Sequence, residues 1–268
     1  MANRRSLPCV LAVSGSDSSA GAGLQADIKA CAALGVYAAT AITAITAQNS
    51  LGVAHVESVS PLMVQQQMLT VLQDLPVAVI KIGMLGQVAV VDSVCDVLER
   101  YPDLPVVLDP VLISSSGREL LDVPGKARMI ERLFPRVTLL TPNVAEAACL
   151  AGVSQEEVDS EPERAIRAVA KLGVGAVLLK GGHRSGEDCV DLLWLDGRLH
   201  RYSTPRLEVQ NNHGTGCTLA SAIAANLAKG MLLPDAISAA KGYLTRALAT
   251  ADRFTLGRGH GALNHFNW

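Results

Sequence analysis

Residues 77–108, VAVIKIGMLGQVAVVDSVCDVLERYPDLPVVL, contain two short apolar runs on either side of a longer stretch with a different apolar spacing. The runs Val77–Ile82 and Val106–Leu108 are rich in β-branched residues and predict strands that are buried on both faces. Between them, Val88–Arg100 carries apolar residues at helical spacing. A strand, a crossover helix and a second strand make the unit of a parallel sheet covered by helices, so this stretch predicts an α/β fold.

The same alternation extends along the chain in both directions. Further strands are predicted at Cys9–Ser14, Tyr37–Thr46, Val53–Val59, Val137–Leu140 and Ala176–Lys180. Further helices are predicted at Leu24–Leu34, Pro61–Asp74, Gly125–Phe134, Val144–Ala151 and Pro162–Leu172. No linker rich in Pro, Ser or charge and no internal repeat interrupts the pattern. We therefore expect residues 1–268 to form a single three-layer domain, with a mostly parallel central sheet flanked by helices on both faces.

The pattern changes in the last third of the chain. The runs Cys189–Leu195 and Leu199–Ser203 flank Asp196-Gly197, a dipeptide suited to a tight hairpin turn. Two helices are predicted after Asn212, at Thr215–Lys229 and Pro234–Ala251. Gly230 is expected to end the first of them, and Pro234 suits the first turn of the second.

Composition limits the classes of function. The chain has 268 residues, with 23 Lys and Arg against 25 Asp and Glu, and this near-neutral balance gives no reason to expect a nucleic-acid or membrane surface. No apolar stretch approaches the about 20 residues of a membrane span, and the apolar run after Pro8 is too short for a secretory signal. The six cysteines show no Cys-x-x-Cys and no metal-ligand spacing, which indicates reduced thiols. We expect a soluble cytoplasmic enzyme.

The strongest functional signal is Asn212–Thr218, NHGTGCT, which directly precedes a predicted helix of small residues. Gly214 and Gly216 let the backbone approach a ligand with no Cβ in the way. The first amides of a helix have no intrahelical partner and lie at the positive end of the helix dipole. These features predict an anion hole for the charge of a transferring phosphoryl group. The alternative is an ordinary helix start with Thr215 as its N-cap.

Cys217 lies inside this predicted anion hole. A thiol at a helix N-terminus can have a pKa well below its ordinary value of about 8.5. Its thiolate would then be able to take the proton from an attacking hydroxyl. The alternative is that Cys217 is a small apolar residue that packs in the first turn of the helix.

A second loop follows the first predicted strand, at Ser14–Asp27, SGSDSSAGAGLQAD. Its glycines do not form the dinucleotide-binding fingerprint, but a loop of this kind at a strand end suits a small ligand. Asp17 or Asp27 would accept hydrogen bonds from that ligand. The alternative is a turn with Asp17 as a helix N-cap.

Acidic and amide groups follow two later strands. Asp109 comes at the tip of the buried strand Val106–Leu108, and Asn143 and Glu146 open the next helix on one face. Oxygen ligands of this kind suit Mg²⁺ beside a phosphate chain. The alternative for Asn143 and Glu146 is a capping box, and the two interpretations are compatible.

Two more strand ends carry candidate ligand-binding groups. Leu179-Lys180-Gly181-Gly182-His183 places a lysine where it would reach a nucleotide phosphate, unless it is only a solvated charge. Thr46-Ala47-Gln48-Asn49-Ser50 ends a strand in amides. A glutamine presents both a donor and an acceptor, which matches the edge of an aminopyrimidine; without further context Gln48 would be a loop amide.

Taken together and in this order, these residues resemble the hydroxymethylpyrimidine/phosphomethylpyrimidine kinases of thiamine biosynthesis, members of the ribokinase-like superfamily. The resemblance runs over nearly the whole chain. It includes Gly15 to Asp27, Ala47-Gln48-Asn49, Lys81–Leu85, Leu108–Val111, Thr141-Pro142-Asn143 with Glu146, Lys180–His183, Asn212–Thr218 and the tail Gly257-x-Gly259-x-Gly261 with His265-Phe266.

The resemblance implies a homodimer that uses ATP and Mg²⁺ in two successive phosphorylations. The first converts 4-amino-5-hydroxymethyl-2-methylpyrimidine to its monophosphate, and the second yields the diphosphate. For the ring, it implies that Gln48 reads the amino edge, that Asp27, Gly15 and Ala22 line the same pocket, and that Met84 and Val111 pack on the ring. For the phosphates, it implies that ATP is contacted by Lys180, Asn143 and Thr215 and that Mg²⁺ is held through Asp109 and Glu146. It also implies that the transition state is bound by Gly214, Thr215, Gly216 and Cys217. Cys217 would be the base.

Two alternatives remain open at this point. Most of the wider superfamily resembles Gly-Ala-Gly-Asp where this chain has Gly214-Thr215-Gly216-Cys217, and the cysteine form is similar to pyrimidine kinases and to some bacterial pyridoxal kinases. A pyridoxal or pyridoxine kinase on the same fold is therefore the first alternative. The second is a non-catalytic pyrimidine sensor, against which the set Asp109, Glu146, Lys180 and Cys217 argues.

Overall fold

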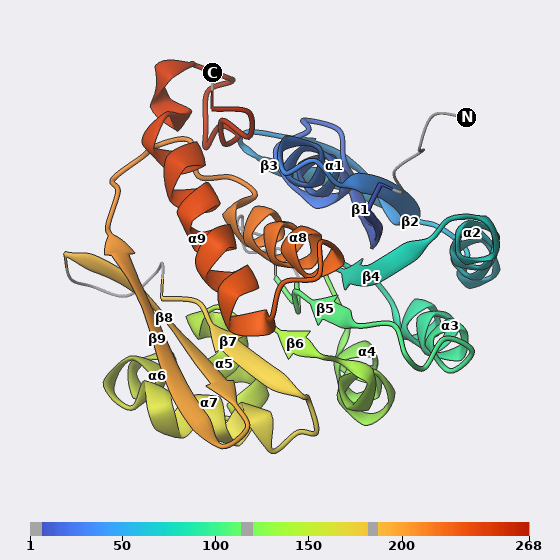
Figure 1. The fold of residues 1–268 in the computed structure, drawn as a ribbon. Helices are drawn as coiled ribbons and strands as arrows, with labels where there is room; N and C mark the ends of the chain where they lie inside the picture. Colours follow the sequence, from blue (N-terminus) through green and yellow to red (C-terminus); the bar gives the residue numbers. More distant parts are fainter. Residues whose placement is uncertain (1–6, 114–119, 182–186, 268) are drawn as a thin grey trace, which may run out of the picture.

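The computed structural model describes residues 7–113, 120–181 and 187–267, and these contain a nine-stranded sheet of order β3-β2-β1-β4-β5-β6-β7-β8-β9 (Figure 1). The strands are β1 Cys9–Asp17, β2 Tyr37–Asn49, β3 Gly52–Ser58, β4 Val77–Ile82, β5 Val106–Leu108, β6 Leu139–Leu140, β7 Ala176–Leu179, β8 Asp188–Leu195 and β9 Arg198–Pro205. The helices are α1 Gly23–Ala33, α2 Pro61–Asp74, α3 Val88–Leu98, α4 Val123–Arg128, α5 Val144–Ala151, α6 Gln155–Ser160, α7 Pro162–Ala170, α8 Thr215–Ala228 and α9 Leu233–Ala249.

The centre of the sheet is parallel and both of its margins are antiparallel. Strands β2, β1, β4, β5, β6 and β7 pair in parallel, whereas β3 pairs antiparallel with β2, and β8 and β9 continue antiparallel from β7. The predicted mostly parallel sheet is confirmed. The predicted strand Val53–Val59 does not continue the parallel alternation, because only a tight turn separates β2 from β3 and no crossover helix can fit there.

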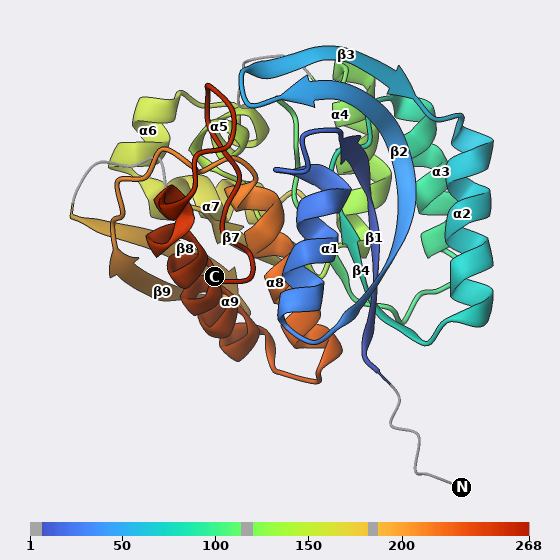
Figure 2. The same cartoon turned by 90° about the horizontal axis from the view of Figure 1, so that it is seen from above.

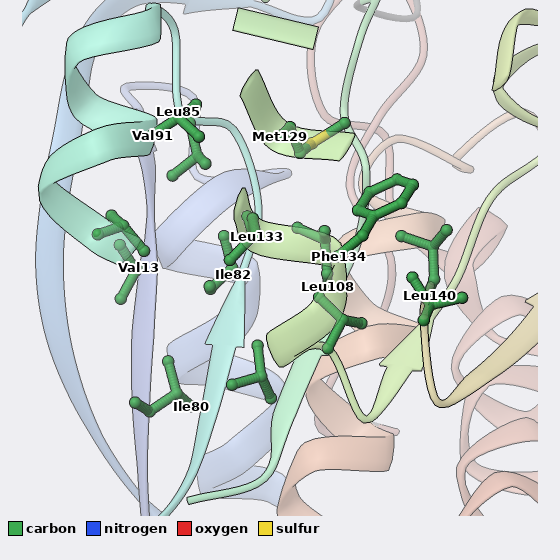
Figure 3. Packing of buried hydrophobic residues seen from close by; sticks show 14 of the residues in the cluster. Val13, Ile80, Ile82, Leu85, Val91, Leu108, Met129, Leu133, Phe134 and Leu140 are labelled. Atoms are coloured by element: carbon green, nitrogen blue, oxygen red, sulfur yellow. The ribbon is translucent and has the colours of Figure 1, made fainter. Parts of the chain in front are cut away.

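Helices cover both faces of the sheet, which gives the three layers expected (Figures 1 and 2). Cys9, Leu11 and Val13 of β1 point into a core built with α2, α3, α5 and α7, part of which Figure 3 shows. Val10 points to the opposite face, into a core built with α1, α8 and α9. This alternation is the period of a strand that is buried on both sides.

Several element ends differ from prediction for local reasons. The predicted helix Gly125–Phe134 begins at Val123, with the Asp122 side chain accepting from Gly125 N, and then widens into a π-helical turn at Met129–Leu133. Helix α6 was not predicted; the Ser154 and Glu157 capping box starts it.

The turn predictions at the end of the chain are confirmed. Asp196 and Gly197 both have positive φ, which suits the two-residue hairpin turn between β8 and β9. Gly230 also has positive φ and follows Lys229, the C-cap of α8, and Pro234 lies in the first turn of α9. Over the described residues, no helix is long and apolar enough to cross a membrane.

Candidate active site

A cavity of about 570 Å³ lies beyond the carboxyl ends of the parallel strands, where ligands bind in sheets of this type. Residues at the ends of β1, β2, β5, β6 and β7 line it together with the start of α8. Of the residues predicted for the site, the cavity is lined by Gly15, Ala22, Gln48, Met84, Asp109, Val111, Asn143, Glu146, Lys180, Gly214, Thr215, Gly216 and Cys217. Asp27 is the exception.

The glycines of the NHGTGCT segment allow a close approach of backbone to backbone at the start of α8. Gly214 is the N-cap, with φ of 84°, and a Cβ on it would collide with the carbonyl of Gly21. A Cβ on Gly216 would lie 3.2 Å from Lys180 Nζ and 3.3 Å from Asp109 Oδ2. The backbone of Gly216 therefore lies close to the charged groups of Lys180 and Asp109.

Thr215 is the first residue of α8 and not its N-cap, contrary to the alternative considered above. Its hydroxyl donates to the carbonyl of Asn212 at 2.6 Å, so it closes the turn that leads into the helix. Within the described part of the chain, no side chain caps α8. Thr215 N donates to Asn212 O at 3.4 Å, which leaves the amides of Gly216 and Cys217 in the first turn as the candidates for an anion site.

Lys180 lies between two carboxylates. Its Nζ is 2.6 Å from Asp109 Oδ1 and 3.9 Å from Glu146 Oε2. Burial raises the pKa of Glu146 to about 7, with Asp109 adding to the rise and Lys180 opposing it. The nearly buried cluster holds two carboxyl groups and only one ammonium, so it has more carboxylate oxygens than Lys180 can pair with. Carboxylate oxygens of this kind fit Mg²⁺ as ligands.

Asn143 and Glu146 form the capping box of α5. Glu146 N donates to Asn143 Oδ1, and Asn143 N donates to Glu146 Oε2, both at 2.8 Å. The box holds the Glu146 carboxylate at the cavity wall beside Lys180, so the capping interpretation is confirmed and the predicted ligand-binding role stays compatible with it.

Cys217 lies half-buried in the first turn of α8 and lines the cavity. Burial raises the pKa of its thiol to about 11, and the ammonium of Lys81 opposes that rise. The sequence suggested a pKa well below the ordinary value, and the structure gives the opposite direction. The helix N-terminus is outweighed here because burial removes water from the thiolate.

The other part of the predicted site is built around Met84. Ser14 Oγ accepts from Met84 N at 3.1 Å, and Thr43 Oγ1 donates to Met84 O at 2.6 Å. A Cβ on Gly15 would lie 3.0 Å from Met84 Sδ, so the side chain of Met84 packs directly on this glycine. Gln48 also lines this part of the cavity, and it is half-buried.

Asp27 lies behind the cavity wall, not in it. It is fully buried, and Lys81 Nζ donates to its two oxygens at 2.8 and 2.9 Å. Ser221 Oγ donates to Oδ1 as well, at 2.6 Å. These contacts saturate the carboxylate, so the structure gives Asp27 a role in joining α1, β4 and α8 in place of the substrate contact that was expected.

Asp17 and His213 are a pair to which the sequence analysis gave no joint role. Asp17 is not a helix N-cap; it accepts from Ser19 N and Oγ through Oδ1 and from Gly21 N and Ala22 N through Oδ2. His213 Nε2 lies 3.1 Å from Asp17 Oδ2. Burial alone would raise the pKa of Asp17, but the bonds from His213, Ser19 and Ala22 lower it to about 2.

The half of the cavity nearest α9 was also missed. Asp191 Oδ2 pairs with Lys241 Nζ at 2.6 Å, and Asp191 Oδ1 accepts from Gly181 N at 2.8 Å. Gly181 is the one hint in the sequence, and the structure explains it, because a Cβ there would collide with the carbonyl of Val190. Gly182 and His183, which were grouped with Lys180, lie outside the described residues.

Comparison with known proteins identifies the family of this chain. A family model described as Phosphomethylpyrimidine kinase matches residues 17–264. This chain belongs to the phosphomethylpyrimidine kinase family. It is 46% identical over 257 residues to the hydroxymethylpyrimidine/phosphomethylpyrimidine kinase of Rhizobium meliloti (strain 1021), with 96% of each chain covered. The predicted family and the kinase class are thereby confirmed, and the pyrimidine interpretation fits better than the pyridoxal one.

Solved structures show the same fold in both substrate groups. Phosphomethylpyrimidine kinase from Clostridium difficile 630 matches with a TM-score of 0.76 and 36% identity, over 89% of this chain and 98% of that one. Pyridoxal kinase from Staphylococcus aureus in complex with AMP-PCP and pyridoxal matches with a TM-score of 0.88 and 29% identity, over 98% of this chain and 95% of that one. The ribokinase-like fold expected for a phosphomethylpyrimidine kinase is confirmed, and overall shape does not separate the two substrates.

Proposed function

We propose that this chain transfers the γ-phosphoryl group of ATP to 4-amino-5-hydroxymethyl-2-methylpyrimidine, and then phosphorylates the monophosphate to the diphosphate. The observation that carries this proposal is that one cavity joins two unlike surfaces. One surface carries Gln48 and Met84, which suit an aminopyrimidine ring. The other carries Lys180 and the open amides of α8, which suit phosphates.

In this mechanism the ring is bound before transfer and its hydroxymethyl oxygen faces the start of α8. Gln48 contacts the polar edge of the ring, while Met84 and Val111 pack on its apolar part. Gly15 and Ala22 bring backbone close to the same ring. The oxygen attacks the γ-phosphorus, the bond from that phosphorus to the bridging β-oxygen breaks, and ADP leaves.

The charge that develops on the phosphoryl group is met by two features. The amides of Gly216 and Cys217 lie in the first turn of α8, and the ammonium of Lys180 lies 3.2 Å from where a Cβ of Gly216 would be. Such groups act mainly by positioning and by electrostatic stabilisation. Asn143 and Thr215 complete the nucleotide side of the cavity.

The hydroxyl proton goes to the sulfur of Cys217. Because burial raises the thiol pKa to about 11, the thiol must first lose its own proton. The Lys81 ammonium behind the cavity wall favours the thiolate. Turnover should therefore depend on the small fraction of the enzyme that carries the thiolate.

Asp109 and Glu146 are the residues that would hold Mg²⁺, directly or through water. The ion would neutralise charge on the phosphates of ATP. We expect it to act together with Lys180, and we expect the protein to work as a cytoplasmic single-domain homodimer.

The proposal is tested by following products over time with mass spectrometry. Purified protein with ATP and Mg²⁺ should convert the hydroxymethylpyrimidine first to the monophosphate and later to the diphosphate. Addition of excess EDTA should stop both conversions. If Mg²⁺-ATP yields neither product from the pyrimidine or its monophosphate, the proposed function is wrong.

A further inference from the structure

Three side chains meet at the ring-facing end of the cavity. His213 Nε2 lies 3.1 Å from Asp17 Oδ2 and 3.0 Å from the side-chain amide of Gln48. All three side chains line the cavity, and those of His213 and Asp17 are only 12% and 3% exposed. His213 Nε2 therefore lies within hydrogen-bond distance of two groups. Whether this nitrogen carries a proton decides whether each of them accepts a hydrogen bond from it or donates one to it.

The Asp17 neighbour can only accept a hydrogen bond. Oδ1 already accepts from Ser19 N at 2.8 Å and from Ser19 Oγ at 2.7 Å. Oδ2 already accepts from Gly21 N at 3.0 Å and from Ala22 N at 2.8 Å. A carboxyl group that receives this many donors is ionised, so His213 Nε2 must carry a proton and donate it to Oδ2.

The Gln48 neighbour must then present its oxygen to His213. An amide occupies the same space in two orientations that exchange oxygen and nitrogen, and the hydrogen-bond network decides between them. With its nitrogen toward His213, two donors would face each other at 3.0 Å. With its oxygen there, the proton on His213 Nε2 is shared between two acceptors.

The opposite end of the amide supports the same orientation. Thr46 Oγ1 lies 2.9 Å from Ser16 O and 3.2 Å from the Gln48 amide. The hydroxyl has one proton, and the shorter contact directs it to the Ser16 carbonyl. The oxygen of Thr46 is then an acceptor, which is what the NH₂ group of Gln48 requires.

We propose that Asp17 and His213 are positioning residues that fix the Gln48 amide with its oxygen toward His213 and its NH₂ toward Thr46. They thereby set the order of acceptor and donor that the ring meets. This inference rests on the proposed function, in that it takes a pyrimidine ring as the ligand. It adds two residues through which the site selects among rings.

The fixed order has a chemical consequence. A 4-aminopyrimidine edge offers a donor at the amino group and an acceptor at the ring nitrogen, so both bond to the amide at once. The corresponding 4-pyrimidinone offers the reverse, an acceptor at the carbonyl and a donor at the ring N–H. An amide fixed in one orientation pairs with the donor and acceptor of the 4-aminopyrimidine. It leaves the corresponding groups of the 4-pyrimidinone unpaired, and a buried hydrogen-bonding site strongly rejects a ligand whose polar groups stay unpaired.

The fold anchors the imidazole in this place. A Cβ on Gly21 would collide with Cδ2 of His213, so the ring packs directly on that glycine. His213 N also donates to Gly261 O at 3.0 Å. The loop after β1 thus packs on the imidazole, and the tail of the chain fixes the backbone of His213.

The test compares dissociation constants, measured by calorimetry, for the aminopyrimidine and for the 4-pyrimidinone that also carries 2-methyl and 5-hydroxymethyl groups. Wild type should prefer the aminopyrimidine by ~100-fold or more. His213→Leu and Asp17→Asn should lower this ratio by ~10-fold or more, because the amide is then free to turn. His200→Leu on β9, away from the cavity, is the matched control and should keep the ratio.

Two further measurements guard against a folding defect. Gly21→Ala displaces the imidazole without removing it and should lower the ratio in the same way. In ¹⁵N NMR of wild type, His213 should carry its proton on Nε2; a proton on Nδ1 alone overturns the proposal. So does a His213→Leu protein that folds and keeps the wild-type ratio.

The outcomes separate this inference from the function on which it rests. A wild-type protein that binds and phosphorylates the aminopyrimidine, yet discriminates less than ~3-fold between the rings, contradicts the inference alone. A wild-type protein that binds neither ring contradicts both.

Discussion

The thiol of Cys217 lies where two opposing influences act on its pKa. The start of α8 and the ammonium of Lys81 favour the thiolate, whereas burial disfavours it and prevails, raising the pKa to about 11. A base with a high pKa is strong once it is deprotonated but rarely in that state at neutral pH. If Cys217 is the base, the turnover rate should therefore depend on pH.

Replacing Cys217 by alanine should lower kcat by ~10²–10⁴ and change the KM for the pyrimidine little, because a lost base affects transfer more than binding. In wild type, kcat should rise about tenfold per pH unit between pH 7 and 9, since the thiolate fraction grows in that range. Steady-state kinetics of both proteins across this range checks both statements. Unchanged turnover in the variant would leave Cys217 as a packing residue of α8.

Gly214 supports a second prediction at the scale of one residue. Gly214→Ala should lower both stability and kcat, because φ is 84° and the new Cβ would collide with the carbonyl of Gly21. Gly230→Ala is the matched control: its φ is 85°, and a Cβ there would meet no atom of the described residues within 4 Å beyond its chain neighbours. It should cost about 1 kcal/mol of unfolding free energy and leave kcat intact. Equal effects in the two variants would show that strain, not the close approach at α8, sets the cost.

At the scale of elements, the buried pair of Lys81 and Asp27 ties β4 to α1, and Ser221 adds α8. Lys81→Met and Asp27→Leu should each lower the free energy of unfolding by about 3–5 kcal/mol, because each leaves an uncompensated charge. The double variant should recover much of that loss. Urea unfolding of the three proteins measures this.

The same variants test where Asp27 acts. Because its carboxylate is saturated behind the cavity wall, Asp27→Leu should weaken pyrimidine binding far less than Gln48→Ala does. A fully stable Asp27→Leu protein that had lost ring binding would return Asp27 to the substrate site.

The C-terminal tail is held to α8 by His265, and the burial of this histidine makes the stability of the fold depend on pH. Thr218 Oγ1 lies 3.0 Å from His265 Nε2, and His265 Nδ1 lies 3.1 Å from Leu263 O. Burial lowers the pKa of His265 from 6.5 to about 4. Below pH 6.5 the unfolded chain therefore takes up a proton that the folded chain refuses until about pH 4.

Stability should thus fall as the pH drops from 6.5 to 4, by about 3 kcal/mol from this residue alone. His265→Gln should lack that part of the loss. The free energies of unfolding of the two proteins, compared at pH 7 and pH 4.5, give the answer. Parallel pH profiles would mean that His265 is not buried in its neutral form.

At the scale of the whole molecule, the sequence was sufficient for the layers and for most elements. Buried β-branched runs such as Val77–Ile82 and Val106–Leu108 appear as strands at the predicted bounds, because both faces of these strands are covered. The antiparallel edge strand β3 was not distinguished from its parallel neighbours. Its residues pair through a turn that carries none of the usual dipeptide signals. The π-helical turn Met129–Leu133 that follows α4 was not predicted either.

In the candidate site, too, residues with a local sequence signal were predicted, whereas contacts between distant parts of the chain were not. Residues that carry their own local signal, such as Gly214, Lys180 and the Asn143–Glu146 box, were found because strand ends and helix starts are visible in sequence. Asp17 and His213 are 196 positions apart, so only the fold reveals their contact. Asp27 was misplaced for the same reason, because its partner Lys81 lies on another element.

The central claim is that this molecule is a kinase for an aminopyrimidine, built on a fold that also serves pyridoxal kinases. The most direct test is to measure kcat/KM side by side for the hydroxymethylpyrimidine, its monophosphate and pyridoxal, with Mg²⁺-ATP in excess. We predict turnover of both pyrimidines with pyridoxal the poorest acceptor. Turnover confined to pyridoxal would contradict the account of the ring, while leaving the phosphate side of the cavity in place.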